Sequence, residues 1–531
     1  MLTSGAESTP ATPAATSPDP RWRRRASRAD LAAGALCLGL LVAGLLIGRA
    51  HTVPGYGVET DFAAVYSFQA ANLLRGLPYT YSYHPFGYPA LLAVLSPLTG
   101  GDLFAAGKLL ATLAAVTLVA TTHLLARALV DRRTALAGTA VLAVAILPYV
   151  ATAASDLPGA ALVQLALWLG LGARRLGPAR AFAAGVAAAA AFLVRSSGAL
   201  AIAAAAAAVL VLAPAERTRR RGQLLAALLA GVLAGLAPAG LYNLATAGRL
   251  AGPTELVQVG VSYQTPADSG VSATESAVTG LPSVLRVFAS HPVGFLAHYA
   301  GRQISLAAPL LARQGLGFPA YLFVGPGLVL LLARRRSPAA RRLAVWAGFC
   351  LAGYLALGLL DPLIRYYLFL LPFLCLAVAI GALLDGAAGR DGRPLVGRRP
   401  GAGIVAAIVL VGLLGRGREV ARSLADDPRE LLSFAAELRR IAAPGDIIVS
   451  RKPQLAYLAG LRYDVAVDPR DLPTLLRDAR AHGARWLLYS PRTARLWPAL
   501  RTLADPGPAP RGLRLVMSDP RSGVRLYELV R

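Results

Sequence analysis

The sequence has few charged residues and almost no lysine. Charged residues make up 15% of its 531 positions, whereas a soluble globular domain carries about 25%. Lysine occurs only at Lys108 and Lys452, and hydrophobic residues make up 56% of the chain. This composition argues against an ordinary soluble protein and is typical of a protein that spans a membrane.

Cysteine is also scarce. The three cysteines, Cys37, Cys350 and Cys375, all lie in apolar stretches. None has the spacing of metal ligands, and a buried cysteine usually acts as a small hydrophobic residue. The sequence therefore indicates no disulfide framework, no cysteine metal site and no cofactor, and a divalent ion held by carboxylates stays open.

The formal net charge of +26 could suggest a nucleic-acid partner. Many of the arginines, however, stand in short runs between apolar segments, where positive charge sets the orientation of a membrane protein. We therefore predict no nucleic-acid partner.

Apolar runs recur along the chain. A transmembrane helix needs roughly 20 mostly apolar residues, and on this basis we expect about eleven transmembrane helices. They fall near residues 31–48, 103–127, 134–152, 157–173, 181–194, 196–213, 223–247, 317–333, 343–360, 364–385 and 402–416.

The arginine runs predict the orientation. All of them fall on one side of the membrane if the helices alternate in direction, and this side should be the cytoplasm. The protein is then a multi-pass protein of the cytoplasmic membrane, with its N-terminus inside, its C-terminus outside, and long outward loops at 50–101 and 248–316. The arginine runs lie at 21–28, 127–133, 174–180, 217–221, 334–342 and 390–399.

Three regions follow from these patterns. Residues 1–28 form a tail, rich in Ser, Thr, Ala and Pro and basic at its end, that we predict to be disordered and cytoplasmic. Residues 29–427 form the membrane region, and residues 428–531 form a small α/β domain that caps it from outside.

Within 248–316, residues 282–312 predict one or two amphipathic helices at the membrane interface. In the last region, strands are predicted at 446–450, 485–490, 513–517 and 524–529, and amphipathic helices at 430–443 and 472–481.

A series of short motifs follows the predicted helices. The first outward loop carries ETDF at 59–62, RGLPY at 75–79 and YHPFGYP at 83–89; later motifs are SDLP at 155–158, RSSG at 195–198, RYY at 365–367 and LP at 371–372. In their order and common sidedness they resemble the GT-C glycosyltransferases, in the branch that contains protein O-mannosyltransferases and aminoarabinose transferases. The resemblance covers nearly the whole chain.

The resemblance implies a function. Relatives transfer a monosaccharide from a polyprenyl-phosphate donor to an acceptor hydroxyl, and the acceptor here would be a lipid, a glycan or a protein. It also implies that Asp61 is the acidic residue after the first helix and that Asp156 is a second carboxylate of the site. His84 departs from the lysine that aminoarabinose transferases often carry before the proline.

Physical reasoning points to the same residues. A carboxylate can take the proton of an attacking hydroxyl, and arginines can stabilise the leaving phosphate. Charged groups beside apolar segments are costly and are usually functional. We therefore predict Asp61 as the catalytic base. The predicted substrate-binding residues are Asp156, His84, Arg195, Arg365, Tyr83, Tyr88 and Glu59.

Each of these residues also has a structural alternative. The two aspartates could cap the helices that follow them, a helix at 62–74 in the case of Asp61. His84 could bond local backbone, and the tyrosines could be interfacial anchors. Arg195 could extend to the interface, and Arg365 could pair with Asp361 one turn away.

Two other functions compete with glycosyl transfer. A transporter or flippase of lipid-linked sugars would need ionisable residues near the middle of the membrane and paired internal repeats, and no clear repeat is present. A non-catalytic membrane scaffold would have no reason to gather carboxylates and arginines at one membrane face.

Overall fold

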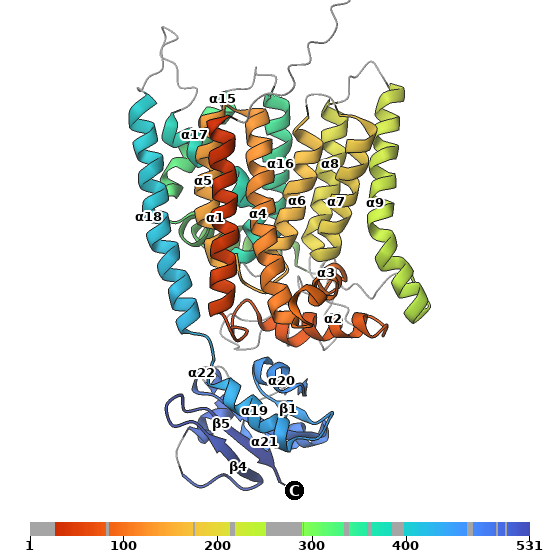
Figure 1. Ribbon diagram of the computed structural model, residues 1–531, viewed down its shortest axis with the longest axis vertical. Helices are drawn as coiled ribbons and strands as arrows, with labels where there is room; N and C mark the ends of the chain where they lie inside the picture. Colours follow the sequence, from red (N-terminus) through yellow and green to blue (C-terminus); the bar gives the residue numbers. More distant parts are fainter. Residues whose placement is uncertain are drawn as a thin grey trace, which may run out of the picture.

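The computed structural model consists of a bundle of long helices with a smaller α/β unit at one end (Figure 1). The structure describes residues 27–80, 84–173, 176–212, 218–250, 289, 291–333, 339–357, 363–384, 398–464, 471–494, 498–504 and 507–530. Most of the predicted N-terminal tail lies outside this part of the chain.

Each apolar run of the sequence corresponds to a helix. The bundle consists of α1 (Arg28–Ala50), α4 (Leu103–Leu129), α5 (Arg132–Ala145), α6 (Asp156–Leu171), α7 (Pro178–Val194), α8 (Ala199–Leu212), α9 (Thr218–Ala247), α15 (Val324–Ala333), α16 (Ala340–Leu357), α17 (Leu371–Leu383, preceded by the 3₁₀ helix η9, Ile364–Leu370) and α18 (Arg398–Ala425). Among the described residues, 6 helices are long and apolar enough to cross a membrane, or up to 7 if a bent pair is counted as one span. The chain is therefore a multi-pass membrane protein, and the count of eleven spans stays a prediction.

Helices α1 and α4 run in opposite directions, and their contacts mark the two ends of the bundle. At one end of the bundle, Arg127 near the end of α4 pairs with Asp30 at the start of α1, with 2.5 Å between Nη1 and Oδ1. At the other end, Lys108 donates from Nζ to the carbonyl oxygens of Gly48 and His51, at 2.8 and 2.6 Å. The end that carries α2, α3 and the α/β unit is called the sheet-side end here, and the opposite one the arginine-side end (Figure 1).

The loop after α1 folds into short helices along the sheet-side end. It contains a π-helix, η1 (Phe62–Tyr66), then α2 (Ser67–Leu74), α3 (Gly87–Leu95) and the 3₁₀ helix η2 (Ser96–Thr99). The helix predicted at 62–74 is thus confirmed, with a π-helical first part. Gly87 allows α3 to approach α7, because a Cβ there would lie 2.6 Å from the carbonyl carbon of Leu193.

The second long loop also carries helices where the structure describes it. They are α13 (Pro292–Arg302), η6 (Gln303–Ala307), α14 (Ala308–Leu310) and η7 (Leu311–Leu316), followed by η8 (Ala320–Phe323). The predicted helical stretch within 282–312 is confirmed from Pro292 onward. Its earlier part, and most of 248–291, falls outside the described residues.

The C-terminal unit is a five-stranded mixed sheet with the order β2-β1-β3-β5-β4. β1 runs parallel to β2 and β3, and β5 runs antiparallel to β3 and β4. The strands are β1 (Ile447–Val449), β2 (Arg462–Asp464), β3 (Ala484–Tyr489), β4 (Leu513–Ser518) and β5 (Arg525–Leu529). The helices are α19 (Leu431–Ile441), α20 (Gln454–Ala459), α21 (Leu472–Ala481), α22 (Pro491–Ala494) and the 3₁₀ helix η10 (Pro498–Leu503).

The four predicted strands and the two predicted helices of this region are confirmed, whereas β2 was not predicted. β2 is a short edge strand of sequence RYD, and charged edge strands lack the apolar alternation by which strands are recognised. One apolar core packs around Leu475 and Leu487. A second, around Phe434 and Trp486, lies against α19 and α20.

Candidate functional site

Asp61 lies at the sheet-side end, at the start of the helix that follows α1. Its side chain makes no capping hydrogen bond with the π-helix behind it. Instead, its Oδ2 lies 3.5 Å from Nη2 of Arg365, and 31% of the Asp61 side chain is exposed. Arg365 also donates from Nη1 to the carbonyl oxygen of Val58, at 3.0 Å. The capping alternative therefore has no support, and Asp361, the proposed partner of Arg365, is not among the described residues.

Asp156 forms a second carboxylate–guanidinium pair. It occupies the first turn of α6, where its Oδ1 lies 2.5 Å from Nη1 of Arg195 at the end of α7. Only 4% of the Asp156 side chain is exposed, against 20% for Arg195. Gly159 brings the two helices together here, since a Cβ on it would lie 3.2 Å from Cβ of Arg195. Arg195 therefore points into the protein and does not extend away to the interface.

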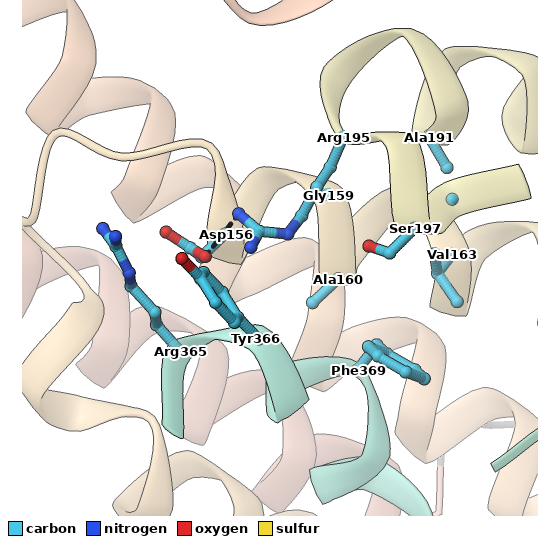
Figure 2. A pocket seen from close by; sticks show the side chains of 11 residues that line it. Asp156, Gly159, Ala160, Val163, Ala191, Arg195, Ser197, Arg365, Tyr366 and Phe369 are labelled. Carbon is cyan, nitrogen blue, oxygen red and sulfur yellow. Dashed lines mark ion pairs between the residues drawn. The ribbon is translucent and has the colours of Figure 1, made fainter. Parts of the chain in front are cut away.

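The ring of Tyr366 joins the two pairs. Cζ of Arg195 lies 4.6 Å from the ring centroid and Cζ of Arg365 lies 5.2 Å from it, both within the range of cation–π attraction. Figure 2 shows Asp156, Arg195, Tyr366 and Arg365 converging on one pocket. The far wall of this pocket is formed by Ala191, Ser197 and Phe369. The cavity volume is about 10 Å³, about that of a single water site.

A chain of polar side chains continues from this pocket. The hydroxyl of Tyr66 lies 3.0 Å from Nδ1 of His84 and 3.0 Å from Oγ of Ser155. Burial lowers the pKa of His84 below its usual value, although the nearby charge of Asp61 acts in the opposite direction. His84 is therefore mainly neutral at pH 7, so it can exchange hydrogen bonds but cannot supply a fixed positive charge.

The structure brings five of the predicted site residues together. Asp61 pairs with Arg365 and Asp156 with Arg195, and all four charges lie close enough to His84 to affect its pKa. The remaining three are Glu59, Tyr88 and Tyr83. Glu59 is buried in a separate hydrogen-bond network.

Of the two tyrosines predicted in the first loop, Tyr88 is buried. Tyr88 has no exposed surface, and its ring packs against Tyr66 with 4.7 Å between centroids. This burial argues against the alternative of Tyr88 as an interfacial anchor, and the contact of Tyr88 with substrate stays a prediction. Tyr83 is not among the described residues.

Three residues of the site were not predicted as site residues: Tyr66, Ser155 and Tyr366. Ser155 and Tyr366 lie in the SDLP and RYY motifs, but their uncharged side chains did not mark them as site residues. Tyr66 ends a π-helix, a rare conformation that is frequent at functional sites and is not visible in the sequence. Among the described residues, no three His, Cys, Asp or Glu side chains lie together as metal ligands.

The fold and part of the sequence match known proteins. Residues 83–242 match the family described as dolichyl-phosphate-mannose-protein mannosyltransferase. The structure is similar to ArnT from Cupriavidus metallidurans bound to undecaprenyl phosphate, with a TM-score of 0.58 at 13% identity over 93% of this chain and 97% of that chain. The chain therefore has the fold of the GT-C glycosyltransferases. A second GT-C structure, the archaeal oligosaccharyltransferase AglB from Archaeoglobus fulgidus in complex with an inhibitory peptide and a dolichol-phosphate, gives a TM-score of 0.52 at 11% identity over 92% of this chain and 74% of that chain.

These likenesses show the GT-C fold that the sequence motifs predicted, and residues 83–242 match a glycosyltransferase family. Comparison with curated protein sequences finds no match. The range that matches the family contains His84, Asp156 and Arg195, and it ends before Arg365. The GT-C fold thus brings together residues from the first loop, from α6 and α7, and from the start of the late span.

Chemically, the site combines two carboxylates with two guanidinium groups and an aromatic ring. An arginine has five N–H donors, so each guanidinium can bond its carboxylate and still offer donors to a phosphate. Asp61 is the more exposed carboxylate, and Asp156 is almost fully buried. The arrangement is suited to bind a phosphate and to accept a proton beside it.

Proposed function

We propose that the protein transfers a monosaccharide from a polyprenyl-phosphate donor to an acceptor hydroxyl, with inversion at the anomeric carbon. The observation that carries this proposal is the pair of carboxylate–arginine contacts that share the ring of Tyr366 at the sheet-side end. ArnT and AglB are described as bound to undecaprenyl phosphate and to a dolichol-phosphate, which supports a lipid phosphate as the donor's carrier.

Asp61 is the general base in this proposal. As the acceptor oxygen forms its bond to the anomeric carbon, its proton passes to Asp61, and the bond from that carbon to the phosphate oxygen breaks with both electrons going to the lipid phosphate. A single displacement of this kind inverts the anomeric configuration. The exposure of Asp61 favours it over the buried Asp156, because a base must reach the proton that it abstracts.

Arg195 and Arg365 hold the phosphate. The leaving lipid phosphate gains negative charge as the bond breaks, and fixed cationic donors stabilise that charge best where water is largely excluded. Asp156 and the ring of Tyr366 keep the two guanidinium groups in place before the donor arrives. His84 and Tyr66 contribute neutral hydrogen bonds at the edge of the same site.

We further propose that the sheet-side end faces the outside of the cytoplasmic membrane. The described parts of the arginine runs, such as Arg127 and Arg342, lie at the opposite end, which the positive-inside tendency assigns to the cytoplasm. The donor's phosphate lies at the headgroup level, where α2 and α3 run along the bundle (Figure 1). The C-terminal α/β unit is then extracytoplasmic and covers the site.

The proposal is tested with the purified full-length protein, synthetic polyprenyl-phosphate hexose and pentose donors, and acceptor extracted from the native envelope. We expect sugar transfer or slow donor hydrolysis, and Asp61→Asn should lower turnover by about 10²–10⁴-fold, the usual contribution of a general base. The matched control is Asp102→Asn, also near the sheet-side end. The Asp102 side chain caps α4, and asparagine caps a helix equally well, so turnover should stay at the wild-type level.

Two outcomes would contradict the proposal. Movement of labelled donor across vesicles without any covalent product would favour the transporter reading. Full turnover in the Asp61→Asn protein would show that another group takes the proton.

A further inference from the structure

The carboxylate of Glu59 connects the two segments that carry the site's aspartates. Its Oε1 accepts the backbone N–H of Ala153 at 2.6 Å, three residues before Asp156. Its Oε2 accepts the backbone N–H of Gly55 at 2.7 Å. The backbone of Glu59 also begins the helix of Asp61, since the N–H of Ala63 donates to its carbonyl oxygen at 3.1 Å. One side chain therefore fixes the spacing between the Asp61 segment and the start of α6.

A histidine completes this contact. Nε2 of His51 lies 2.7 Å from Oε2 of Glu59, and Nδ1 lies 2.9 Å from the carboxylate of Asp427, which follows α18. Burial disfavours the charged imidazole, but the two carboxylates outweigh it and raise the pKa of His51 to about 9. His51 is therefore an imidazolium between two buried carboxylates at neutral pH.

Glu59 is not placed to bind a substrate. Only 3% of its side chain is exposed, and its two oxygens already accept from three N–H groups. A buried carboxylate with these partners would leave unsatisfied N–H donors behind if it turned toward a ligand, and an unsatisfied buried donor is destabilising. The earlier prediction that Glu59 contacts substrate is therefore replaced by a different role.

We propose that Glu59 is a positioning residue, which holds Asp61 and Asp156 at their working separation through its contacts with Ala153, Gly55 and His51. The inference rests on the proposed function, since it assigns Asp61 and Asp156 to one reaction. His51 extends the same contact to Asp427 and so ties the junction before the C-terminal unit to the catalytic loop.

Two variants separate positioning from simple stability. Glu59→Gln preserves the shape, but its NH₂ group must face an N–H donor whichever way the amide is turned. Asp427→Ala removes the other carboxylate partner of His51 and leaves the contact between Glu59 and Ala153 intact. Both variants lose a buried ionic contact of the same imidazolium, so both should lower the Tm of the protein.

Only Glu59→Gln should change the site. We expect its kcat to fall by about 10- to 100-fold, as small displacements of catalytic groups can cause, while donor KM and the Kd for undecaprenyl phosphate stay within about threefold, a change of under 1 kcal/mol. Asp427→Ala should keep kcat within the same threefold margin. In hydrogen exchange, the peptide that carries Ala153 should exchange faster in Glu59→Gln and not in Asp427→Ala.

Several results would overturn the assignment. They are an unchanged kcat in Glu59→Gln, a raised KM at constant kcat, or a parallel loss of kcat and Tm in both variants. Hydrogen exchange needs no turnover, so unaltered exchange at Ala153 would refute the positioning role even in an inactive preparation. If the wild-type protein shows no turnover although its hydrogen exchange at Ala153 is slow, the result counts against the proposed function and not against the positioning role.

Discussion

At the residue scale, Tyr366 is the group whose contribution is easiest to isolate. Its ring contacts both guanidinium groups, and a cation–π contact contributes roughly 0.5–2 kcal/mol, the larger values applying where water is excluded. We expect Tyr366→Leu to raise donor KM by about tenfold, the equivalent of 1.4 kcal/mol, because both arginines lose the surface against which they are held.

The matched control for this change is Tyr366→Phe, which keeps the ring and removes only the hydroxyl. Its donor KM should stay within about threefold of the wild type, a difference of less than 1 kcal/mol. Steady-state kinetics over a range of donor concentrations provide the measurement. Equal increases of donor KM in Tyr366→Leu and Tyr366→Phe would mean that the hydroxyl of Tyr366, and not its ring, carries the interaction.

The charged members of the site could be predicted because they are rare in this chain. Asp61, Asp156, Arg195 and Arg365 stand beside apolar segments, where charge is costly and therefore informative. Their partners could not be predicted. For Arg365 the sequence offered Asp361 as an alternative partner, and in the structure Arg365 reaches Asp61 in the first loop, a pairing that depends on how distant helices pack.

The role of Glu59 could not be predicted from the sequence either. A carboxylate two residues from Asp61 appeared equally suited to the site. Its partners are Ala153 and His51, the latter paired in turn with Asp427. Nothing in the local sequence distinguishes a carboxylate that faces a pocket from one that faces a buried backbone N–H.

At the element scale, α7 and α9 pack closely through glycines. A Cβ on Gly231 would lie 2.1 Å from the carbonyl oxygen of Phe182, whereas a Cβ on Gly222 of the same helix would have no neighbour within 4 Å. Small residues allow such close approach between membrane helices. Gly231→Ala should force the two helices apart and destabilise the protein by about 1–3 kcal/mol, the usual cost of overpacking.

Thermal unfolding of the detergent-solubilised protein measures this effect. Gly222→Ala is the control, since alanine favours a helix by up to about 1 kcal/mol over glycine and has space here. We expect a lower Tm for Gly231→Ala and an equal or slightly higher Tm for Gly222→Ala. Equal Tm values for both variants would argue against this helix crossing.

Elements with a strong apolar period were the most predictable. The helix at 472–481 was predicted with the same bounds that α21 has, because its apolar face repeats at helical spacing. The π-helix η1 and the edge strand β2 were missed. The π-helix η1 depends on a local shift of backbone hydrogen bonds, and β2 depends on its pairing with β1. Neither element produces a recognisable sequence pattern in its own residues.

At the scale of the whole molecule, sequence and structure agree on which segments share an end of the bundle. Arg127 near the end of α4 meets the start of α1, and Arg342 near the start of α16 donates to the carbonyl oxygen of Leu171 at the end of α6. The site residues and the C-terminal unit lie at the other end (Figure 1). Alternation of helices alone could predict this sidedness, whereas the docking of α20 against the first loop, through Tyr457 and Phe62, could not.

The orientation of the two ends is open to a direct test. Ser433 in α19 and Gln223 in α9 are both exposed and lie at opposite ends of the molecule. In intact cells, a membrane-impermeant maleimide should label Ser433→Cys, and it should label Gln223→Cys only after permeabilisation. The wild type is the background control, because Cys350 and Cys375 are buried and Cys37 is half-buried.

The expected pattern follows from the arginine runs, since positive residues beside short loops are retained in the cytoplasm. Labelling of Gln223→Cys alone in intact cells would invert the orientation and place the site in the cytoplasm. The donor's phosphate would then have to be presented from the inner leaflet. Labelling of Ser433→Cys alone would place Asp61, its arginine partner and the α/β unit together on the outer face, where a polyprenyl-phosphate sugar and an envelope acceptor can both reach them.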